Sequence, residues 1–244
     1  MKFPSVAGVT PRMSVRHLSR STFCILAALA LTSLVSGAEP TSTPAKKRVL
    51  LLGDSISIGY TPFVQELLVD KAVVLRPMKN GKAENCSSTA AGVQNIDRWL
   101  QIDGGKWDVI HFNWGLHDLK HMLRDDPTKT SDQASDPPLA SVEVYEKQLR
   151  EIVGKLQATG AKLIFATTTY VPEGPHKVYR NNADVERYNT AALKIMKEKN
   201  IAVDDLYTAS KENYQTWQLP VNVHFKPEGS KALAELVVKS ISGS

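Results

Sequence analysis

Residues 48–57 read RVLLLGDSIS, and this stretch decides the fold. Residues 48–52, an arginine followed by valine and three leucines, have the length of a strand and end at Gly53, which predicts a buried β-strand. Ser55 follows three residues after Leu52, on the turn that leads into the next helix. The stretch therefore predicts a strand whose carboxyl end presents a serine hydroxyl.

Beyond this stretch, apolar runs of strand length alternate with amphipathic stretches of helical length. Further strands are predicted over 72–75, 108–112, 162–166 and 201–203. Helices are predicted over 61–70, 93–100, 141–158, 185–199 and 227–241, and loops over 124–138 and 171–182. Thr61 and Ser141 are the expected N-caps of the first and third helices.

This alternation indicates the class of fold. Strands that alternate with helices predict a parallel sheet covered on both faces, and right-handed crossovers make it doubly wound. We therefore expect an α/β domain, a three-layer sandwich around a five-stranded parallel sheet. In such a sheet, functional side chains gather just beyond the carboxyl ends of the strands.

The first 38 residues have the pattern of a signal peptide. Four basic residues and no acidic residue precede an apolar run over 23–35, and small residues at 36 and 38 suit cleavage before Glu39. The run is short for a membrane span, and an uncleaved N-terminal anchor is the alternative. We expect an exported protein, secreted or periplasmic, with a polar linker over 39–46 and one domain over 47–243.

Charge and cysteine content each exclude a class of protein. The formal charge is +5, but four of the 30 basic residues lie in the first 38 positions, which leaves 26 against 25 acidic residues. No cluster of Lys and Arg follows residue 48, so we expect no nucleic-acid partner. Loss of the signal peptide leaves Cys86 as the single cysteine, which excludes an internal disulfide.

A histidine near the end of the chain is placed to meet Ser55. His224 precedes Pro227, where the last helix is predicted to begin, and its loop returns to the carboxyl edge of the sheet. A serine hydroxyl needs a base near neutral pH, and histidine suits that role. Ser55 has two alternative roles, a helix cap and a phosphate-binding residue. Thr61 is the better cap, and the lysine of a phosphate-binding loop is missing.

A polar cluster follows the third predicted strand. Asn113 and His117 each carry a side-chain N–H that can stabilise an oxyanion, and the choice between them stays open. A metal site made of His117, Asp118 and His121 is the alternative, but the segment lacks the glutamate of H-E-x-x-H and a distant third ligand. We expect neither a metal ion nor another cofactor.

These segments together resemble the SGNH, or GDSL, hydrolase family over about residues 47–243. Gly53–Ser57 is similar to the first block of that family, Gly115–Asp118 to its third block, G-x-N-D, and Val223–Phe225 to its last block. The resemblance implies a flavodoxin-like fold and hydrolysis of carboxylic esters.

The resemblance also implies roles for single residues. Ser55 is the nucleophile and His224 the base, and the second block falls within residues 85–89. An oxyanion hole is then formed by the backbone N–H groups of Ser55 and Ser87, with the side chain of His117 or Asn113.

The sequence departs from the family pattern at three places. His117 replaces the usual asparagine of the third block, and the second block has no glycine. Val221 stands where the family has an aspartate, three residues before His224, and valine cannot accept an imidazole N–H. We therefore expect a Ser55–His224 dyad, with Asn222 as the candidate that orients the imidazole.

The substrate is less well defined. Export, a polar mature chain and the lack of a long apolar lid favour an O-acetylated carbohydrate over a lipid. The candidate substrate contacts are Asp54, Trp114, Tyr170 and Arg180. A lysophospholipase-like lipid esterase and a non-catalytic carbohydrate-binding domain are the alternatives. We expect a small-molecule or carbohydrate ester as partner and no stable membrane insertion after signal cleavage, and the sequence leaves the oligomeric state open.

Overall fold

The computed structural model describes residues 45–243. The predicted signal peptide and most of the predicted linker lie outside these residues. Among the described residues, no helix has the length and apolar character that a membrane span requires.

A parallel five-stranded sheet forms the centre of the domain. Its strand order is β2-β1-β5-β8-β9, and every neighbouring pair is parallel. The strands are β1 (Lys47–Leu52), β2 (Ala72–Leu75), β5 (Val109–Phe112), β8 (Lys162–Ala166) and β9 (Ala202–Asp204). The predicted α/β sandwich and its five strands are thus confirmed, with strand ends that lie within two residues of those predicted.

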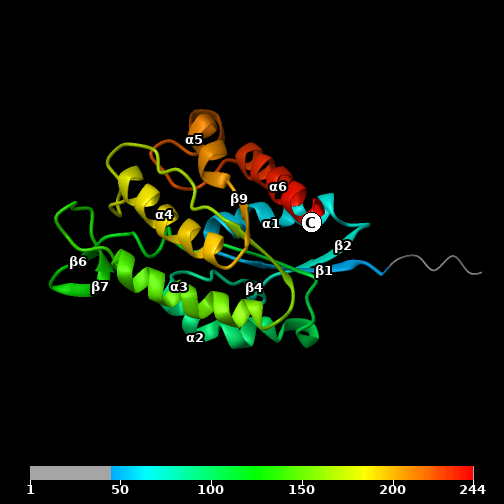
Figure 1. Cartoon of the computed structure of the whole chain (residues 1–244). Coiled ribbons are helices and arrows are strands. Elements are labelled where there is room, and N and C mark those ends of the chain that lie inside the picture. The colour runs from blue at the N-terminus through cyan, green and yellow to red at the C-terminus, as the bar shows by residue number, and fades with distance from the viewer. Residues whose placement is uncertain (1–44, 244) are drawn as a thin grey trace, which may run out of the picture. The chain divides into compact units, whose positions relative to one another are not determined.

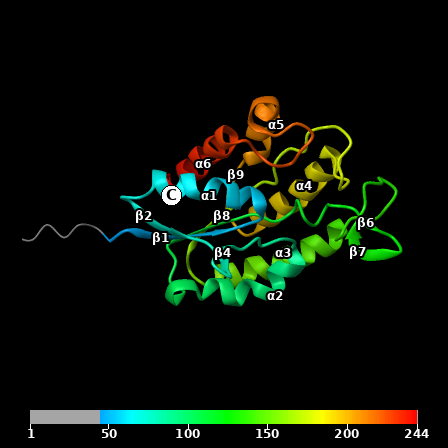
Figure 2. The same ribbon diagram turned by 180° about the vertical axis from the view of Figure 1, so that it is seen from behind.

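Helices cover both faces of this sheet (Figures 1 and 2). α1 packs against α6, and α5 packs on α6; on the opposite face, α2 packs against α3 and α3 against α4. Their bounds are α1 (Ser55–Leu67), α2 (Thr89–Leu100), α3 (Val142–Gln157), α4 (Asn182–Glu198), α5 (Leu206–Trp217) and α6 (Pro227–Ser242). The sheet is therefore shielded from water on both sides.

The core explains why the first strand is so apolar. Val49, Leu50, Leu51 and Leu52 have no exposed surface, because β1 lies inside the sheet and its side chains alternate between two helical layers. Strand order reverses between β1 and β5, which is the switch point where α/β sheets bind their ligands. The segments that follow β1 and β5 are the two that the sequence singled out.

The first helix begins earlier than predicted. α1 starts at Ser55, because the Asp54 carboxylate accepts a hydrogen bond of 2.9 Å from the backbone N–H of Ile56 and caps the helix there. Thr61 is therefore not the cap, and Pro62 lies inside the helix. The Thr61 hydroxyl donates instead to the carbonyl of Ser57, at 2.6 Å. The predicted cap at Ser141 is confirmed.

Three small elements were not predicted. The expected loop over 124–138 contains part of a hairpin, β6 (Met122–Leu123) with β7 (Asp126–Thr130), and a second hairpin pairs β3 (Met78–Lys79) with β4 (Lys82–Ala83). A short 3₁₀ turn, η1, spans Ile102–Gly104. These segments bury few side chains, so they carry no apolar periodicity. α5 was missed for the same reason, because only Leu206 and Ser210 are buried in it.

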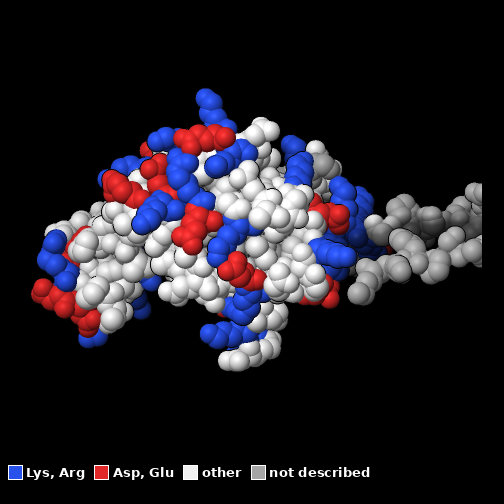
Figure 3. All heavy atoms as spheres, turned by 60° about the horizontal axis from the view of Figure 1, so that its bottom comes forward, with Lys and Arg blue, Asp and Glu red and all other residues white. Residues whose placement is uncertain are grey.

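Basic and acidic side chains lie interspersed over the face drawn in Figure 3. This distribution agrees with the near balance of charge outside the N-terminal segment.

Candidate active site

Ser55 lies on the turn between β1 and α1, at the carboxyl edge of the sheet. The Asp54 cap fixes this turn, and the Asp54 side chain itself is 4% exposed. Ser55 is the first residue of the helix, and it remains partly exposed while its neighbours Asp54 and Ile56 are buried. The local structure thus presents a hydroxyl at the sheet edge and holds its backbone fixed.

The structure brings His224 to this hydroxyl. His224 Nε2 lies 3.0 Å from Ser55 Oγ, although 169 residues separate the two in sequence. The loop before α6 is held by the carbonyl of His224, which accepts a hydrogen bond from the backbone N–H of Leu219 at 3.0 Å. The sequence prediction that these two residues share one edge of the sheet agrees with this geometry.

Asn222 occupies the other side of the imidazole. Its Oδ1 lies 2.8 Å from His224 Nδ1 and also accepts the backbone N–H of His224 at 3.0 Å. An amide oxygen can only accept, so Nδ1 carries the proton and Nε2 is left to accept from the Ser55 hydroxyl. Asn222 therefore holds the tautomer that a general base needs. Val221, at the position of the family's aspartate, cannot accept the imidazole N–H.

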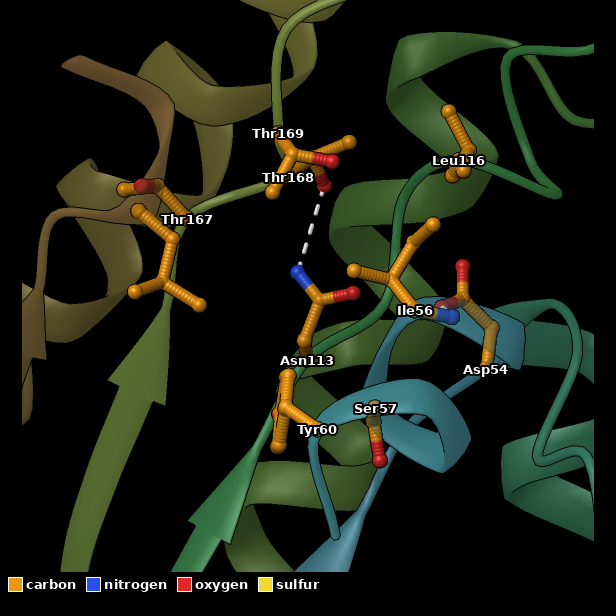
Figure 4. A pocket seen from close by; sticks show the side chains of 10 residues that line it. Asp54, Ile56, Ser57, Tyr60, Asn113, Leu116, Thr167, Thr168 and Thr169 are labelled. Carbon is orange, nitrogen blue, oxygen red and sulfur yellow. Dashed lines mark hydrogen bonds between the residues drawn. The ribbon is translucent and has the colours of Figure 1, made fainter. Parts of the chain in front are cut away.

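Asn113, one of the two predicted side-chain donors, is already engaged. Its amide nitrogen donates to the carbonyl of Ala166 at 2.8 Å and to Thr168 Oγ1 at 3.3 Å, and Figure 4 shows the amide turned toward Thr168. These two bonds use both amide protons. Asn113 thus joins the ends of β5 and β8 rather than facing the serine.

His117 is the remaining candidate for the side-chain donor. Burial lowers its pKa, and the charges of Lys120, Arg180 and His224 act in the same direction, against the opposite effect of Asp54. Its Nδ1 lies 3.4 Å from Ser87 Oγ. When that hydroxyl donates to Nδ1, Nε2 of the neutral ring carries the proton and is free to donate to an oxyanion.

The second predicted backbone donor is occupied. Ser87 has φ of 54°, in the left-handed region that favours glycine, and its N–H donates to Asn85 Oδ1 at 2.8 Å. Ser87 thus adopts a backbone conformation that is easier for glycine than for serine. An oxyanion reaches this N–H only by displacing the Asn85 side chain.

Trp114 is not a substrate contact, which corrects the prediction from sequence. Its side chain is 1% exposed, its ring stacks on Trp99 with centroids 6.3 Å apart, and its Nε1 donates to the carbonyl of Cys86 at 3.3 Å. The ring follows a strand and faces α2, so it belongs to the core. Tryptophans in such places mostly bury apolar area.

Of the other candidate substrate contacts, Asp54 and Tyr170 have structural roles, and Arg180 lies beside His224. Asp54 lines a narrow pocket at the strand ends, but its carboxylate serves as the cap of α1 (Figure 4). The Tyr170 ring packs against Tyr214 and Tyr207, with centroids 4.9 and 6.4 Å away, so it lies over α5 rather than at the serine. Arg180 lines a hollow together with His224.

A buried arginine beneath the turn of Ser55 was missed by sequence reasoning. Arg76 follows β2, is 5% exposed, and donates to the carbonyls of Gly53 and Glu84 and to the hydroxyls of Ser57 and Thr61. It therefore ties the turn of Ser55 to the loop that carries Ser87. An arginine after a short strand has no pattern that indicates this role.

Asp118 is buried below the site and accepts from Thr89. The Thr89 hydroxyl lies 2.5 Å from Asp118 Oδ1 and 2.7 Å from Gln148 Oε1, so its single proton faces two acceptors. Burial raises the pKa of Asp118 to about 7, against the hydrogen bonds from Thr89. A protonated Asp118 can donate to the Thr89 hydroxyl, which then donates its own proton to Gln148 Oε1.

Asp118→Asn is expected to change the pH dependence of stability. In the native protein the folded state holds a proton on Asp118 that the unfolded state releases above its ordinary pKa of 3.8, so the free energy of unfolding falls from there to about pH 7. The variant lacks this fall, and its stability relative to the native protein rises across the same range. Urea titrations at pH 4.5 and 8 measure it.

The exposed carboxylate of Asp97, paired with Lys155, provides the control. Asp97→Asn is expected to leave the difference between the two pH values unchanged. If Asp118→Asn costs as much stability at pH 8 as at pH 4.5, Asp118 is ionised in the folded protein and the assignment is wrong.

Two further features concern reactive groups and metals. Cys86 is buried, and burial raises the pKa of its thiol to about 12, so it is not a nucleophile. Within residues 45–243, His, Cys, Asp and Glu side chains form no group of three or more that could hold a metal ion.

The comparisons with known proteins agree with this arrangement. The model of the GDSL-like lipase/acylhydrolase family matches residues 51–232. No curated protein sequence matches the chain.

Among solved structures, the acetyl xylan esterase AlAXEase is similar with a TM-score of 0.61 and 17% identity, over 80% of this chain and 99% of that one. A lipase/acylhydrolase from Enterococcus faecalis has a TM-score of 0.61 and 18% identity, over 81% and 96%. Axe2, an acetylxylan esterase from Geobacillus stearothermophilus, has a TM-score of 0.60 and 17% identity, over 80% and 94%. Identities this low show a shared fold.

Proposed function

We propose that this chain, which belongs to the GDSL-like lipase/acylhydrolase family, removes O-acetyl groups from carbohydrate with Ser55 and His224 as a catalytic dyad. The contact of 3.0 Å between His224 Nε2 and Ser55 Oγ carries the proposal. The presence of this pair, with its imidazole oriented by Asn222, favours an enzyme over a non-catalytic carbohydrate-binding domain.

The reaction begins at the Ser55 hydroxyl. His224 Nε2 takes the hydroxyl proton while Oγ attacks the ester carbonyl, and His117 with the backbone N–H of Ser55 stabilises the oxyanion. Collapse of the tetrahedral intermediate expels the sugar alcohol, which receives the proton from His224. Water then attacks the acetyl-enzyme in the same manner, which releases acetate and restores Ser55.

The contribution of Asn222 to kcat can be measured with two substitutions. Asn222→Asp keeps both hydrogen bonds to His224 and adds a charge that stabilises the imidazolium, so kcat is expected to rise about tenfold. The acidic limb of the pH–rate profile moves to higher pH, because the protonated base is stabilised too. Asn222→Ala removes the bond to Nδ1 and lowers kcat by about tenfold or more.

Steady-state kinetics on 4-nitrophenyl acetate from pH 5 to 9 measure both variants. Unchanged activity in Asn222→Ala excludes Asn222 as the residue that orients His224. The Asp variant is the matched control for folding, since aspartate has the shape of asparagine and differs only by an oxygen in place of the amide nitrogen.

The names of similar structures support an acetyl group as the acyl part of the substrate. Two of the structures with the same fold carry the name acetyl xylan esterase.

The preference for acyl length tests the substrate class. We expect kcat/KM to be at least about tenfold higher for 4-nitrophenyl acetate than for the octanoate, because a chain that an acetyl site cannot hold displaces the ester carbonyl from Ser55. Initial rates on the series from acetate to octanoate measure this. A preference for octanoate identifies a lipid esterase instead.

We also propose that the protein is exported and loses residues 1–38. The basic, apolar and small-residue segments of that region support this proposal. N-terminal sequencing of the protein from its native host is expected to begin at Glu39.

A further inference from the structure

A hollow beside His224 has a marked excess of basic side chains. We call it the cationic hollow and define it by its lining: Pro175, His176, Lys177, Val178, Arg180, Val221, Asn222, Val223 and His224. Lysine, arginine and histidine are present in this lining, and aspartate and glutamate are not. Its volume is about 470 Å³ and it is open to solvent, which suits a sugar unit.

The cationic hollow lies beside the base of the proposed catalytic pair. His224 belongs to its lining and contacts Ser55 through Nε2 at 3.0 Å. The wall from the β8–α4 connection and the wall from the loop before α6 pack together, so closely that a Cβ on Gly174 would lie 2.6 Å from Val221 Cγ1. The two walls therefore hold the hollow at a fixed place beside the ester.

Arg180 is the best-placed cation in this lining. Its Nε donates to the carbonyl of Leu116 at 2.8 Å, next to His117, so the guanidinium is anchored at one end. Among the described residues, its two terminal nitrogens have no hydrogen-bond or ion-pair partner. Asp54 is the acid whose charge acts on it, but that carboxylate already caps α1. The fork of Arg180 is thus available to a ligand.

Further positive charge lies close to Arg180. Lys120 follows the third block; burial lowers its pKa, and the nearby charge of Arg180 acts in the same direction. Lys177 is exposed in the lining itself. An excess of positive charge in a partly enclosed hollow attracts an anionic substrate and orients it.

We propose that the cationic hollow binds the anionic group of an acidic sugar, a carboxylate or a sulfate, beside the O-acetyl group that Ser55 removes. A guanidinium fork pairs with both groups through two parallel hydrogen bonds. The proposal rests on the esterase function proposed above and names the sugar class. Binding energy from this group, remote from the ester, positions the acetyl carbonyl for attack.

Three matched substrates test this proposal. They are methyl glucosides acetylated at positions 2, 3 and 4 that differ only at C6, which is a hydroxymethyl group, a carboxylate or a hydroxymethyl group esterified with sulfate. Acetate release by the mature protein gives kcat/KM for each. We expect at least one anionic substrate to exceed the neutral one by about 10- to 100-fold at low ionic strength, the range for hydrogen bonds to charged groups. The ratio is expected to shrink in about 1 M NaCl, where the Debye length is about 3 Å.

Two variants connect the preference to Arg180. Arg180→Gln is expected to bring the ratio of anionic to neutral kcat/KM close to unity, and Arg180→Lys, which keeps the charge but not the fork, to leave an intermediate ratio. Arg150→Gln is the control, because Arg150 is an arginine paired with Glu198 across α3 and α4. It is expected to keep the native ratio.

The outcomes separate this proposal from the proposed function. If the protein hydrolyses 4-nitrophenyl acetate but has equal kcat/KM on the three sugars, or hydrolyses none of them, the acidic-sugar proposal is overturned and an esterase remains. Failure to hydrolyse 4-nitrophenyl acetate as well overturns the esterase function itself. A preference for carboxylate or for sulfate alone identifies the group that Arg180 binds. The ratio of the native protein stands even if Arg180→Gln does not fold.

Discussion

Replacing His224 with alanine is expected to lower kcat on 4-nitrophenyl acetate by about 10⁴- to 10⁶-fold, the range seen when the base of a serine hydrolase is removed. In the proposed mechanism, the hydrogen bond of 3.0 Å to Ser55 is the contact through which the hydroxyl proton leaves. Without it, Ser55 must lose its proton to water, and the departing alcohol receives none. KM is expected to change little, because the imidazole acts in the chemical step.

A second histidine provides the control for this substitution. His121 is buried in the β6–β7 region, where its ring packs against Tyr179 and lies 3.7 Å from Asp184. His121→Gln is expected to keep kcat within about tenfold, since the ring does not touch the reacting atoms. Steady-state kinetics on folded samples measure both variants. More than one tenth of native kcat in His224→Ala would falsify the assignment of the base.

Replacing His117 with alanine is expected to lower kcat by about 10²- to 10³-fold, the usual cost of one oxyanion-hole donor. This ring is the proposed side-chain donor, because the Asn113 amide already donates to Ala166 and Thr168. His117→Asn restores a donor of the kind that the family pattern has here, and is expected to recover much of the loss. The comparison of kcat between the Ala and Asn variants measures the donor itself.

The same comparison decides between the two candidate donors. If Asn113→Ala abolishes activity while His117→Ala retains it, the donor is the amide and its bonds to the β8 end must open during catalysis. Melting temperatures of all three variants separate a loss of catalysis from a loss of folding. Asn113→Ala is expected to have a lower melting temperature, since it removes a side-chain hydrogen bond to the end of β8.

The fold was predictable from sequence because its strands are buried on both faces. A run such as residues 49–52 has no polar side chain, and the stretches between such runs have helical periodicity, so order and type follow from pattern alone. The start of α1 was not predictable in this way. Asp54 and Thr61 are both good caps, and the choice of Asp54 depends on where β1 delivers the chain.

The candidate site was predictable in part. Ser55 and His224 lie where strand ends and loops of a doubly wound sheet must meet, so topology alone brings them together. The roles of Asn113 and Trp114 depend on their neighbours in the folded protein. The Asn113 amide donates to the end of β8, and the Trp114 ring packs on Trp99 of α2. Arg76 carries no sequence signal, because its partners are mainly carbonyls and hydroxyls from three separate segments.

The central claim is that His224 makes Ser55 a nucleophile. Its most direct test is reaction with a fluorophosphonate at neutral pH, followed by mass spectrometry of the peptides. We expect a single label, on Ser55, no label in Ser55→Ala, and labelling in His224→Ala slowed by about 10⁴-fold or more. A native protein that takes no label, or a label that persists in Ser55→Ala, contradicts the claim.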